Sequence, residues 1–378
     1  MPLSRREFLA AGAGAAAAGV LQFPFPQMLA GQGASRADRP IRLNSNENAY
    51  GPLPSVLEAM RGAARVASIY PFQRDDEYME KVARFHGVER ERVIAGCGST
   101  EILRMAACAF AGAGRRIIVP TPTFEAILEY ARAEEGQVET VPLTTNYAHD
   151  LEEMLERVHA KEKPPAGLVY ICNPNNPTAS LTPRGAIEDF LRRLPRETHV
   201  LIDEAYHHFA VGAAGYTSFL ERPVDDARVI VARTFSKIYG MAGLRLGYGV
   251  GAPEAIQKMR RYRLWDSANG IALECAMAAL DDREGLAAAA RRIAQDHTDF
   301  ETEAKRRNVS FIPSFTNFFM VECGRPVRAV MAHFAKQGIL IGRPFAGLET
   351  MARISLGTPE EMKAFWRAWD TLPEAARA

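Results

Sequence analysis

The sequence has little of several features that would place it in a special class of protein. Its 46 basic and 45 acidic residues leave a formal net charge of +1, so no basic surplus points to nucleic acid or to an anionic membrane surface. Only five cysteines are present, none in a Cys-x-x-Cys pair, which disfavours a disulfide framework and a metal site and predicts buried free thiols. No Gly-x-Gly-x-x-Gly follows the first expected strand, which disfavours a dinucleotide-binding dehydrogenase.

The composition that remains is that of an ordinary globular protein. Apolar residues make up 47% of the 378 residues and charged residues 24%. This length allows two lobes, or one large α/β domain with a smaller partner. The sequence contains no internal repeat, so repeat architectures are not expected.

The N-terminus differs in kind from the rest. The segment Ser4-Arg5-Arg6-Glu7-Phe8-Leu9 precedes an uncharged Ala/Gly-rich stretch, from Ala10 to Phe23, and together they resemble a twin-arginine export signal. We therefore expect a leader at residues 1–35 and a periplasmic or otherwise exported protein. The stretch is short and broken by glycines, which makes a membrane-spanning helix the weaker interpretation. The alternative is a cytoplasmic protein whose Ala-rich N-terminal helix carries a chance arginine pair, and the cleavage site stays open.

Beyond residue 40 the pattern alternates between strands and helices. Amphipathic segments at 100–111 and 183–194 lie between apolar, β-branched runs. Such alternation predicts an α/β fold with a mainly parallel mixed sheet and helices on both faces. The expected strands are 116–119, 137–141, 167–172, 199–203, 229–234 and 246–250.

The last third of the chain has a different pattern. Residues 252–307 read as helical, and short strands then follow at 317–322, 338–342 and 352–356 around a helix at 327–337. This tail predicts a second, smaller α+β lobe. The expected domains are a leader at 1–35, an N-terminal part of the small lobe at 36–66, a large domain at 67–274 and a small domain at 275–378.

One strand-to-loop corner combines an amine with groups that bind phosphate. Thr234, Ser236 and Lys237 end an expected strand, and Arg245 follows eight residues after the lysine. Pyridoxal phosphate (PLP) needs an amine for its aldehyde, and hydroxyl and cationic donors for its phosphate. On spacing alone, a solvent-facing lysine after a strand is an equally good interpretation.

Three further segments offer weaker signals. Asp203 ends a buried strand, where a carboxylate can face a pyridine nitrogen, although it could equally cap a helix or bind a metal. The turn Asn173-Pro174-Asn175-Asn176-Pro177-Thr178 offers an amide donor, and Gly96-Cys97-Gly98-Ser99-Thr100 opens a helix as an anion site would. Each of these alone is only a turn or a capped helix.

Together and in this order, the four segments resemble the fold-type-I PLP-dependent aminotransferases of class I and II. The resemblance is closest to the histidinol-phosphate aminotransferase branch and runs from Asn44 to Phe365. The branch's Asn-Glu-Asn opening is similar to Asn46-Glu47-Asn48, its Arg-Tyr-Pro to Ile69-Tyr70-Pro71, and its C-terminal Leu-Arg-Ile-Ser-x-Gly-Thr to Ala352–Thr358. This resemblance implies a large lobe with a mainly parallel mixed sheet, a small α+β lobe, and PLP as cofactor.

The resemblance also implies roles for individual residues. Lys237 would bond covalently to the cofactor, and Asp203 would pair with the pyridine nitrogen, while Asn176 and Tyr206 would reach the phenolic oxygen. Phe124 would stack on the cofactor ring. The residues implied to hold the phosphate are Ser99, Thr100, Thr234, Ser236 and Arg245.

Other implied roles concern the substrate and the partner subunit. Tyr70 would reach the cofactor phosphate of a second subunit, which implies a homodimer with shared sites, and Arg353 would bind the substrate carboxylate. Small-molecule amino acids and 2-keto acids are the implied substrates. The other residues implied to bind substrate are Asn48, Tyr50 and Arg343.

The substrate half of the pattern departs from the branch. No tyrosine stands in Asp38–Leu43, ahead of the opening motif, where the branch has one for substrate phosphate. One extra residue precedes Arg343, and Ala179 replaces a glycine. The first two departures weaken histidinol phosphate as the substrate. Two alternatives therefore remain: a PLP-dependent lyase on the same fold, such as a phosphothreonine decarboxylase, and a non-catalytic binding protein, which the presence of Lys237, Asp203 and Arg245 disfavours.

Overall fold

The structure is a computed structural model that describes residues 39–373. The expected signal at residues 4–9 and the expected leader at 1–35 lie outside the described residues. Within the described part of the chain, no helix is both long and apolar enough to span a bilayer.

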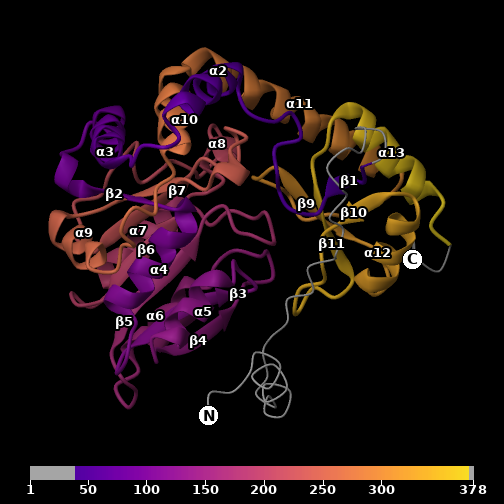
Figure 1. Ribbon diagram of the computed structural model, residues 1–378. Helices are drawn as coiled ribbons and strands as arrows, with labels where there is room; N and C mark the ends of the chain where they lie inside the picture. The colour runs from indigo at the N-terminus through magenta and orange to yellow at the C-terminus, as the bar shows by residue number, and fades with distance from the viewer. Residues whose placement is uncertain (1–38, 374–378) are drawn as a thin grey trace, which may run out of the picture. The chain divides into compact units, whose positions relative to one another are not determined.

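A seven-stranded sheet forms the centre of the fold (Figure 1). Its strands lie in the order β2-β8-β7-β6-β5-β3-β4. Only β8 runs against its neighbours, so the sheet is mixed and mainly parallel, as predicted. The bounds are Val93–Gly96 for β2, Arg116–Thr121 for β3, Gln137–Pro142 for β4, Ala166–Cys172 for β5, His199–Asp203 for β6, Val229–Thr234 for β7 and Gly247–Val250 for β8.

Helices cover both faces of this sheet because its central strands are apolar on both sides. One face packs against α4 (Gly98–Phe110), α5 (Ala126–Ala133) and α9 (Pro253–Arg260) in one apolar cluster. The other face packs in a second cluster against α6 (Leu151–His159) and α7 (Arg184–Arg193). Further helices on the described chain are α2 (Pro54–Ala63), α3 (Phe72–His86), α8 (His207–Ala210) and α10 (Gly270–Asp281).

The direction of the strands gathers the expected site residues at one edge. The parallel strands β2, β3, β5, β6 and β7 all end there, and ligand-binding groups in α/β sheets commonly lie at this carboxyl edge. Because β8 is antiparallel to β7, the same edge is where β8 begins. The segments after β2, β5, β6 and β7 and the segment before β8 therefore meet.

The C-terminal third forms two short sheets. β9 (Phe318–Glu322) pairs antiparallel with β11 (Met351–Ser355), and β10 (Ile339–Ile341) pairs parallel with the N-terminal β1 (Ile41–Leu43). The helices α12 (Val327–Lys336) and α13 (Pro359–Asp370) follow β9 and β11, and the long α11 (Arg283–Arg306) precedes β9 (Figure 1). The pairing of β1 with β10 places the first described segment beside the last strands of the chain. The domain boundaries themselves stay a prediction.

Most expected elements are present, but some differ, and the short strand β1 was not expected. The six expected strands of the large sheet form, but β2 was not expected because its run of four residues is too short to show a period. The helical stretch expected over 252–307 is broken by residues 261–269, which lie between α9 and α10. All five cysteines are free, and four of them are buried.

Candidate active site

Lys237 follows β7, and its amine faces inward. Its Nζ donates a hydrogen bond to the main-chain oxygen of Asn46 at 3.2 Å and lies 5.3 Å from the centre of the Tyr206 ring. Among the described residues no carboxylate pairs with this amine. Burial, helped by the nearby Arg353, lowers the pKa of Lys237 to about 8. A larger share of the amine is therefore neutral and nucleophilic than in an exposed lysine.

Asp203 is the buried carboxylate at the end of β6. One carboxylate oxygen accepts a hydrogen bond from the Tyr170 hydroxyl at 2.9 Å, and the other accepts from the Ala205 main-chain N–H at 3.1 Å. Burial raises the pKa of Asp203 to about 6, while these two bonds act in the opposite direction. The group therefore stays mostly ionised at neutral pH, as a partner for a protonated ring nitrogen must. Tyr170 was missed by sequence reasoning because its place beside Asp203 depends on the strand register.

A second group of predicted residues converges on Arg245. Its Nη1 donates to Ser236 Oγ at 3.3 Å, and its Nη2 donates to Thr100 Oγ1 at 3.5 Å. The Thr234 hydroxyl donates to Ser236 Oγ at 2.9 Å. We call this group the anion cradle, and it consists of Ser99, Thr100, Thr234, Ser236 and Arg245.

Two glycines keep the anion cradle open. A Cβ on Gly98 would lie 2.4 Å from Arg245 Nη2, and a Cβ on Gly247 would lie 2.4 Å from the main-chain nitrogen of Ser99. Because α4 begins at Gly98, the N–H groups of its first turn have no helical acceptors. A helix N-terminus beside a guanidinium and hydroxyls is suited to phosphate.

Arg353, on β11, reaches the same region from the C-terminal third. Its Nη1 donates to Asn176 Oδ1 at 2.7 Å, its Nη2 donates to the Asn44 carbonyl at 3.0 Å, and its buried Nε has no described partner. The first bond turns the NH₂ group of Asn176 away from the guanidinium. Burial lowers the pKa of Arg353 to about 10, so it stays charged at neutral pH. Since a guanidinium has five N–H groups, donors remain for an anion.

Asn46 connects several of these residues, and sequence reasoning missed it. Its backbone is left-handed, with φ +53°, and its side chain is buried. Its Nδ2 donates to the Tyr206 hydroxyl at 3.0 Å, and its main-chain N–H donates to Ser355 Oγ at 2.8 Å. Its main-chain oxygen accepts from both Lys237 and Asn317 Nδ2. The available signal was an asparagine, the residue after glycine that best tolerates this backbone, in a motif already singled out.

The other residues expected to bind substrate are placed differently. Asn48 lies close to the lysine, because its Nδ2 donates to the main-chain oxygen of Ile238 at 2.9 Å. The Tyr50 hydroxyl instead donates to the Asp296 carboxylate on α11 at 3.0 Å. The structure therefore brings Asn48, but not the Tyr50 hydroxyl, towards the Lys237 segment.

Arg343 and Phe124 lie at neighbouring positions. Arg343 forms an ion pair with Glu125, the residue after Phe124, and its guanidinium lies 4.4 Å from the centre of the Phe345 ring. The guanidinium of Arg353 lies 5.1 Å from that same ring. Phe124 is partly buried against the apolar cluster under α4 and α5. The two arginines therefore share one aromatic neighbour.

Tyr70 is not brought to the anion cradle of its own chain. The residue is 72% exposed, and its ring stacks on Phe72 with 5.5 Å between centres. No contact between Tyr70 and the cradle is described within the chain. The expected role of Tyr70 in a second subunit stays a prediction.

The residues gathered here fit PLP. The lysine amine suits its aldehyde, the glycine-lined cradle of hydroxyls and cation suits its phosphate, and the buried carboxylate suits its ring nitrogen. Each of these protein groups has the charge and the burial that the matching group of PLP requires.

Comparison with known proteins agrees with this chemistry. The model of the family "Aminotransferase class I and II" matches residues 38–368. A histidinol-phosphate aminotransferase of Moorella thermoacetica is 34% identical over 87% of this chain and 84% of its own length, and an aromatic amino acid aminotransferase of Cutibacterium acnes is 32% identical over 92% and 95%. The crystal structure of histidinol-phosphate aminotransferase from Sinorhizobium meliloti with pyridoxal-5'-phosphate has a TM-score of 0.81 and 30% identity, covering 90% of this chain and 91% of that one.

The match covers nearly all of the described chain, and it includes every strand of the central sheet. The four segments recognised in the sequence lie together at one edge of that sheet. The chain therefore belongs to the class I and II aminotransferase family and is a PLP-dependent aminotransferase.

Proposed function

We propose that Lys237 is the catalytic amine of a transaminase that uses α-amino acids and 2-keto acids. The observation that carries this proposal is the amine itself, inward-facing and without a carboxylate partner among the described residues. Holding an unpaired lysine away from water costs free energy. A buried, unpaired amine at the carboxyl edge of the sheet is therefore a candidate for a functional group.

The proposed cofactor contacts follow from the groups described above. Asp203 would hold the proton on the ring nitrogen, and the amide of Asn176 and the hydroxyl of Tyr206 would donate to the phenolic oxygen. Phe124 would cover the ring, and the anion cradle would hold the phosphate. When bound, PLP supplies an aldehyde that bonds to amines and a ring that accepts an electron pair from Cα.

The protein's own part in the reaction is binding and proton transfer. Arg353 would hold the substrate carboxylate with its unused N–H groups, which fixes the orientation of the Cα–H bond. The neutral amine of Lys237 would then take the proton from Cα and later return it, as a general base and acid. A lysine with a pKa near 8 suits both roles at neutral pH.

The arrangement around Arg353 supports an α-amino acid as donor. Among residues 39–373 no carboxylate pairs with Arg353, whereas Arg343 already forms an ion pair with Glu125. A substrate carboxylate therefore has one guanidinium available without breaking an existing ion pair. This favours a donor with an α-carboxylate over an amine that carries only a phosphate. The relatives include enzymes named for each kind of substrate, histidinol phosphate and aromatic amino acids.

A half-reaction screen tests this assignment. The purified holoenzyme is mixed with single amino acids or with histidinol phosphate, and the cofactor absorbance and the keto product are followed. We expect stoichiometric keto acid from α-amino acids. Release of carbon dioxide without keto acid would instead identify the lyase, and a response to histidinol phosphate alone would contradict the proposed donor class.

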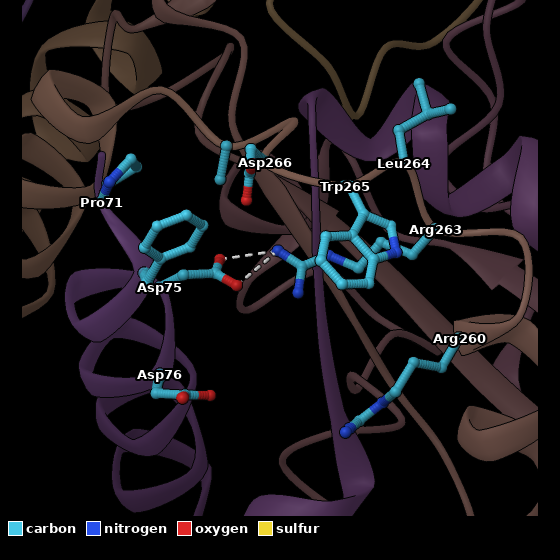
Figure 2. Close-up of a pocket in the computed structure, with 10 residues that line it drawn as sticks. Pro71, Asp75, Asp76, Arg260, Arg263, Leu264, Trp265 and Asp266 are labelled. Atoms are coloured by element: carbon cyan, nitrogen blue, oxygen red, sulfur yellow. Dashed lines mark hydrogen bonds and ion pairs between the residues drawn. The ribbon is translucent and has the colours of Figure 1, made fainter. Parts of the chain in front are cut away.

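We further propose that the protein is a homodimer in which Tyr70 completes the partner's site. Tyr70 and Trp265 are both exposed, Trp265 to 93%, and the two hollows that they line share Pro71 and Ala268. Figure 2 shows Trp265 and Leu264 at a hollow beside Pro71, with Arg263 in an ion pair with Asp75. A second copy of the chain, related by two-fold symmetry, is the proposed cover for this surface.

Mixing inactive subunits should restore activity if the sites are shared. We expect Tyr70→Phe and Lys237→Ala homodimers each to be impaired, and their mixture after subunit exchange to recover about a quarter of wild-type activity, because half the dimers are mixed and each has one intact site. Activity and sedimentation of the mixture give the measurement. A fully active monomer, or a mixture no better than its parts, would count against the shared site.

We also propose export of the folded protein through the twin-arginine route. The support is the Ser4–Leu9 motif and the uncharged stretch after it. A route that carries folded proteins would retain a phosphorylated cofactor loaded in the cytoplasm, whereas threading would remove it. We expect the wild type in the periplasmic fraction and an Arg5→Lys, Arg6→Lys double variant in the cytoplasm. If the wild type and the double variant both stay in the cytoplasm at full length, the export proposal is contradicted. The assignment of Lys237 as the catalytic amine would not be affected.

A further inference from the structure

We propose that Asn317, acting through the main-chain oxygen of Asn46, is a positioning residue for the Lys237 amine. It deepens the proposed function, because it rests on Lys237 as the catalytic amine. Asn317 comes from the segment just before β9, Asn46 from the segment after β1, and Lys237 from the loop after β7. The three meet at one oxygen atom.

The hydrogen bonds fix the position of this oxygen. It accepts from Lys237 Nζ at 3.2 Å and from Asn317 Nδ2 at 3.1 Å. The same Nδ2 also donates to the Glu47 carbonyl at 3.0 Å. Both N–H groups of this amide are therefore used on two successive carbonyls, which sets the orientation of the amide and leaves its Oδ1 buried without a described partner.

The side chain of Asn46 has a separate task. Its Nδ2 binds the Tyr206 hydroxyl, and its Oδ1 accepts from Ser355 Oγ at 3.2 Å. Its left-handed backbone is a conformation that surrounding contacts must hold in place. The main-chain oxygen and the amide of Asn46 thus act on different partners, so they can be tested separately.

An acceptor for the amine matters because proton transfer depends on geometry. The free amine has four carbon–carbon rotors behind it, and the described acceptor for its N–H is the Asn46 oxygen. If that oxygen moves, the amine lone pair loses its fixed direction towards the substrate. A displacement of about 1 Å at a reacting group costs up to about a hundredfold in rate.

The first test replaces Asn317 with leucine, which has a similar branched shape and removes both donors. We expect turnover to fall by about tenfold to a hundredfold. The Michaelis constant of the donor and the affinity for PLP should stay within about twofold, because Arg353 and the anion cradle are unchanged. The α-deuterium isotope effect on the half-reaction should rise, since proton transfer becomes slower. Asn317→Ala, which also lacks both donors, repeats the test if the leucine variant does not fold.

A second readout needs no turnover. In the cofactor-free protein, acetylation of Lys237 is followed by peptide mass spectrometry across pH. A hydrogen bond from the charged amine raises the pKa of Lys237, so the Asn317→Leu variant should be acetylated at lower pH than the wild type. The charged groups that act on this amine are Arg353, Asp203, Glu47 and Arg245, and all are retained. The exposed Asn146→Leu serves as the matched control and should behave as the wild type.

Separate outcomes identify which idea fails. Asn46→Gly keeps the main-chain oxygen and the left-handed backbone, so its acetylation profile should match the wild type although Tyr206 loses a partner. Unchanged turnover, isotope effect and acetylation in both Asn317 variants would overturn the positioning role. Loss of PLP with an unchanged isotope effect would also overturn it, since the residue would then be structural. A Lys237→Ala variant that still transaminates would instead refute the proposed function.

Discussion

Replacing Lys237 with alanine is expected to abolish transamination and the covalent bond to PLP. The variant loses the amine that the cofactor aldehyde requires and the base that moves the Cα proton, so the rate should fall by at least about a thousandfold. Borohydride reduction followed by mass spectrometry measures the bond, and keto acid formation measures turnover. A reducible adduct in the variant would show that another lysine is used.

The control for this variant must separate chemistry from folding. Lys336, an exposed lysine at the end of α12, can be replaced by alanine and should change neither readout. Relative to a variant without this amine, the wild-type cofactor-free protein should gain stability between pH 8 and about 10.5, because there the unfolded chain binds the proton that folded Lys237 has lost. Below pH 8 the amine is protonated in both states and its burial is unfavourable. This pH dependence should disappear when Lys237 is replaced by methionine.

Replacing Arg353 with alanine is expected to weaken donor binding far more than PLP binding. The guanidinium is partly buried beside Phe318 and Phe345, and a substrate carboxylate would pair with it away from water. Losing one partner of such a pair costs about 2–5 kcal/mol, so the Michaelis constant of the donor should rise by about thirtyfold or more. Half-reaction kinetics and PLP titration measure the two effects separately.

A lysine at this position gives the sharper comparison. Arg353→Lys keeps the charge but loses the two-pronged geometry, so its donor affinity should lie between wild type and alanine. Arg343→Ala tests the neighbouring arginine, which Glu125 already engages and which should matter less. Loss of PLP with unchanged donor affinity in Arg353→Ala would mean that the arginine is structural, through its bonds to Asn176 and the Asn44 carbonyl.

The sequence predicts the main functional residues of the site better than it predicts the residues that hydrogen-bond to them. Lys237 and Asp203 each stand beside a strand end, and a parallel sheet brings strand ends together, so their meeting could be expected from the order of elements. Arg245 precedes the antiparallel β8, and it was expected near them because it follows Lys237 by only eight residues. Their supporting contacts could not be expected in this way. Tyr170 reaches Asp203 only because of the register between β5 and β6. That register is set by packing across the whole sheet rather than by local residues.

The substrate side was harder to predict for a related reason. Asn46 stands in a polar motif and Asn317 follows Thr316, but nothing local indicates that one main-chain oxygen would serve both Asn317 and Lys237. The Tyr50 hydroxyl is held by Asp296, which lies in a helix that shows only an amphipathic pattern. Contacts between segments hundreds of residues apart depend on tertiary packing that periodicity does not record.

The pairing of β1 with β10 also determines when, during synthesis of the chain, the parts of the site can become fixed. Asn46 leaves the ribosome early, yet the segment that carries it is fixed by a strand at residues 339–341 and by Ser355. The oxygen that receives the Lys237 amine is therefore held in place only after nearly the whole chain has been synthesised. The large sheet can form earlier, because its strands end at Val250. A ribosome-bound chain that stops before β10 would thus present the lysine and the anion cradle in a site still open on one side.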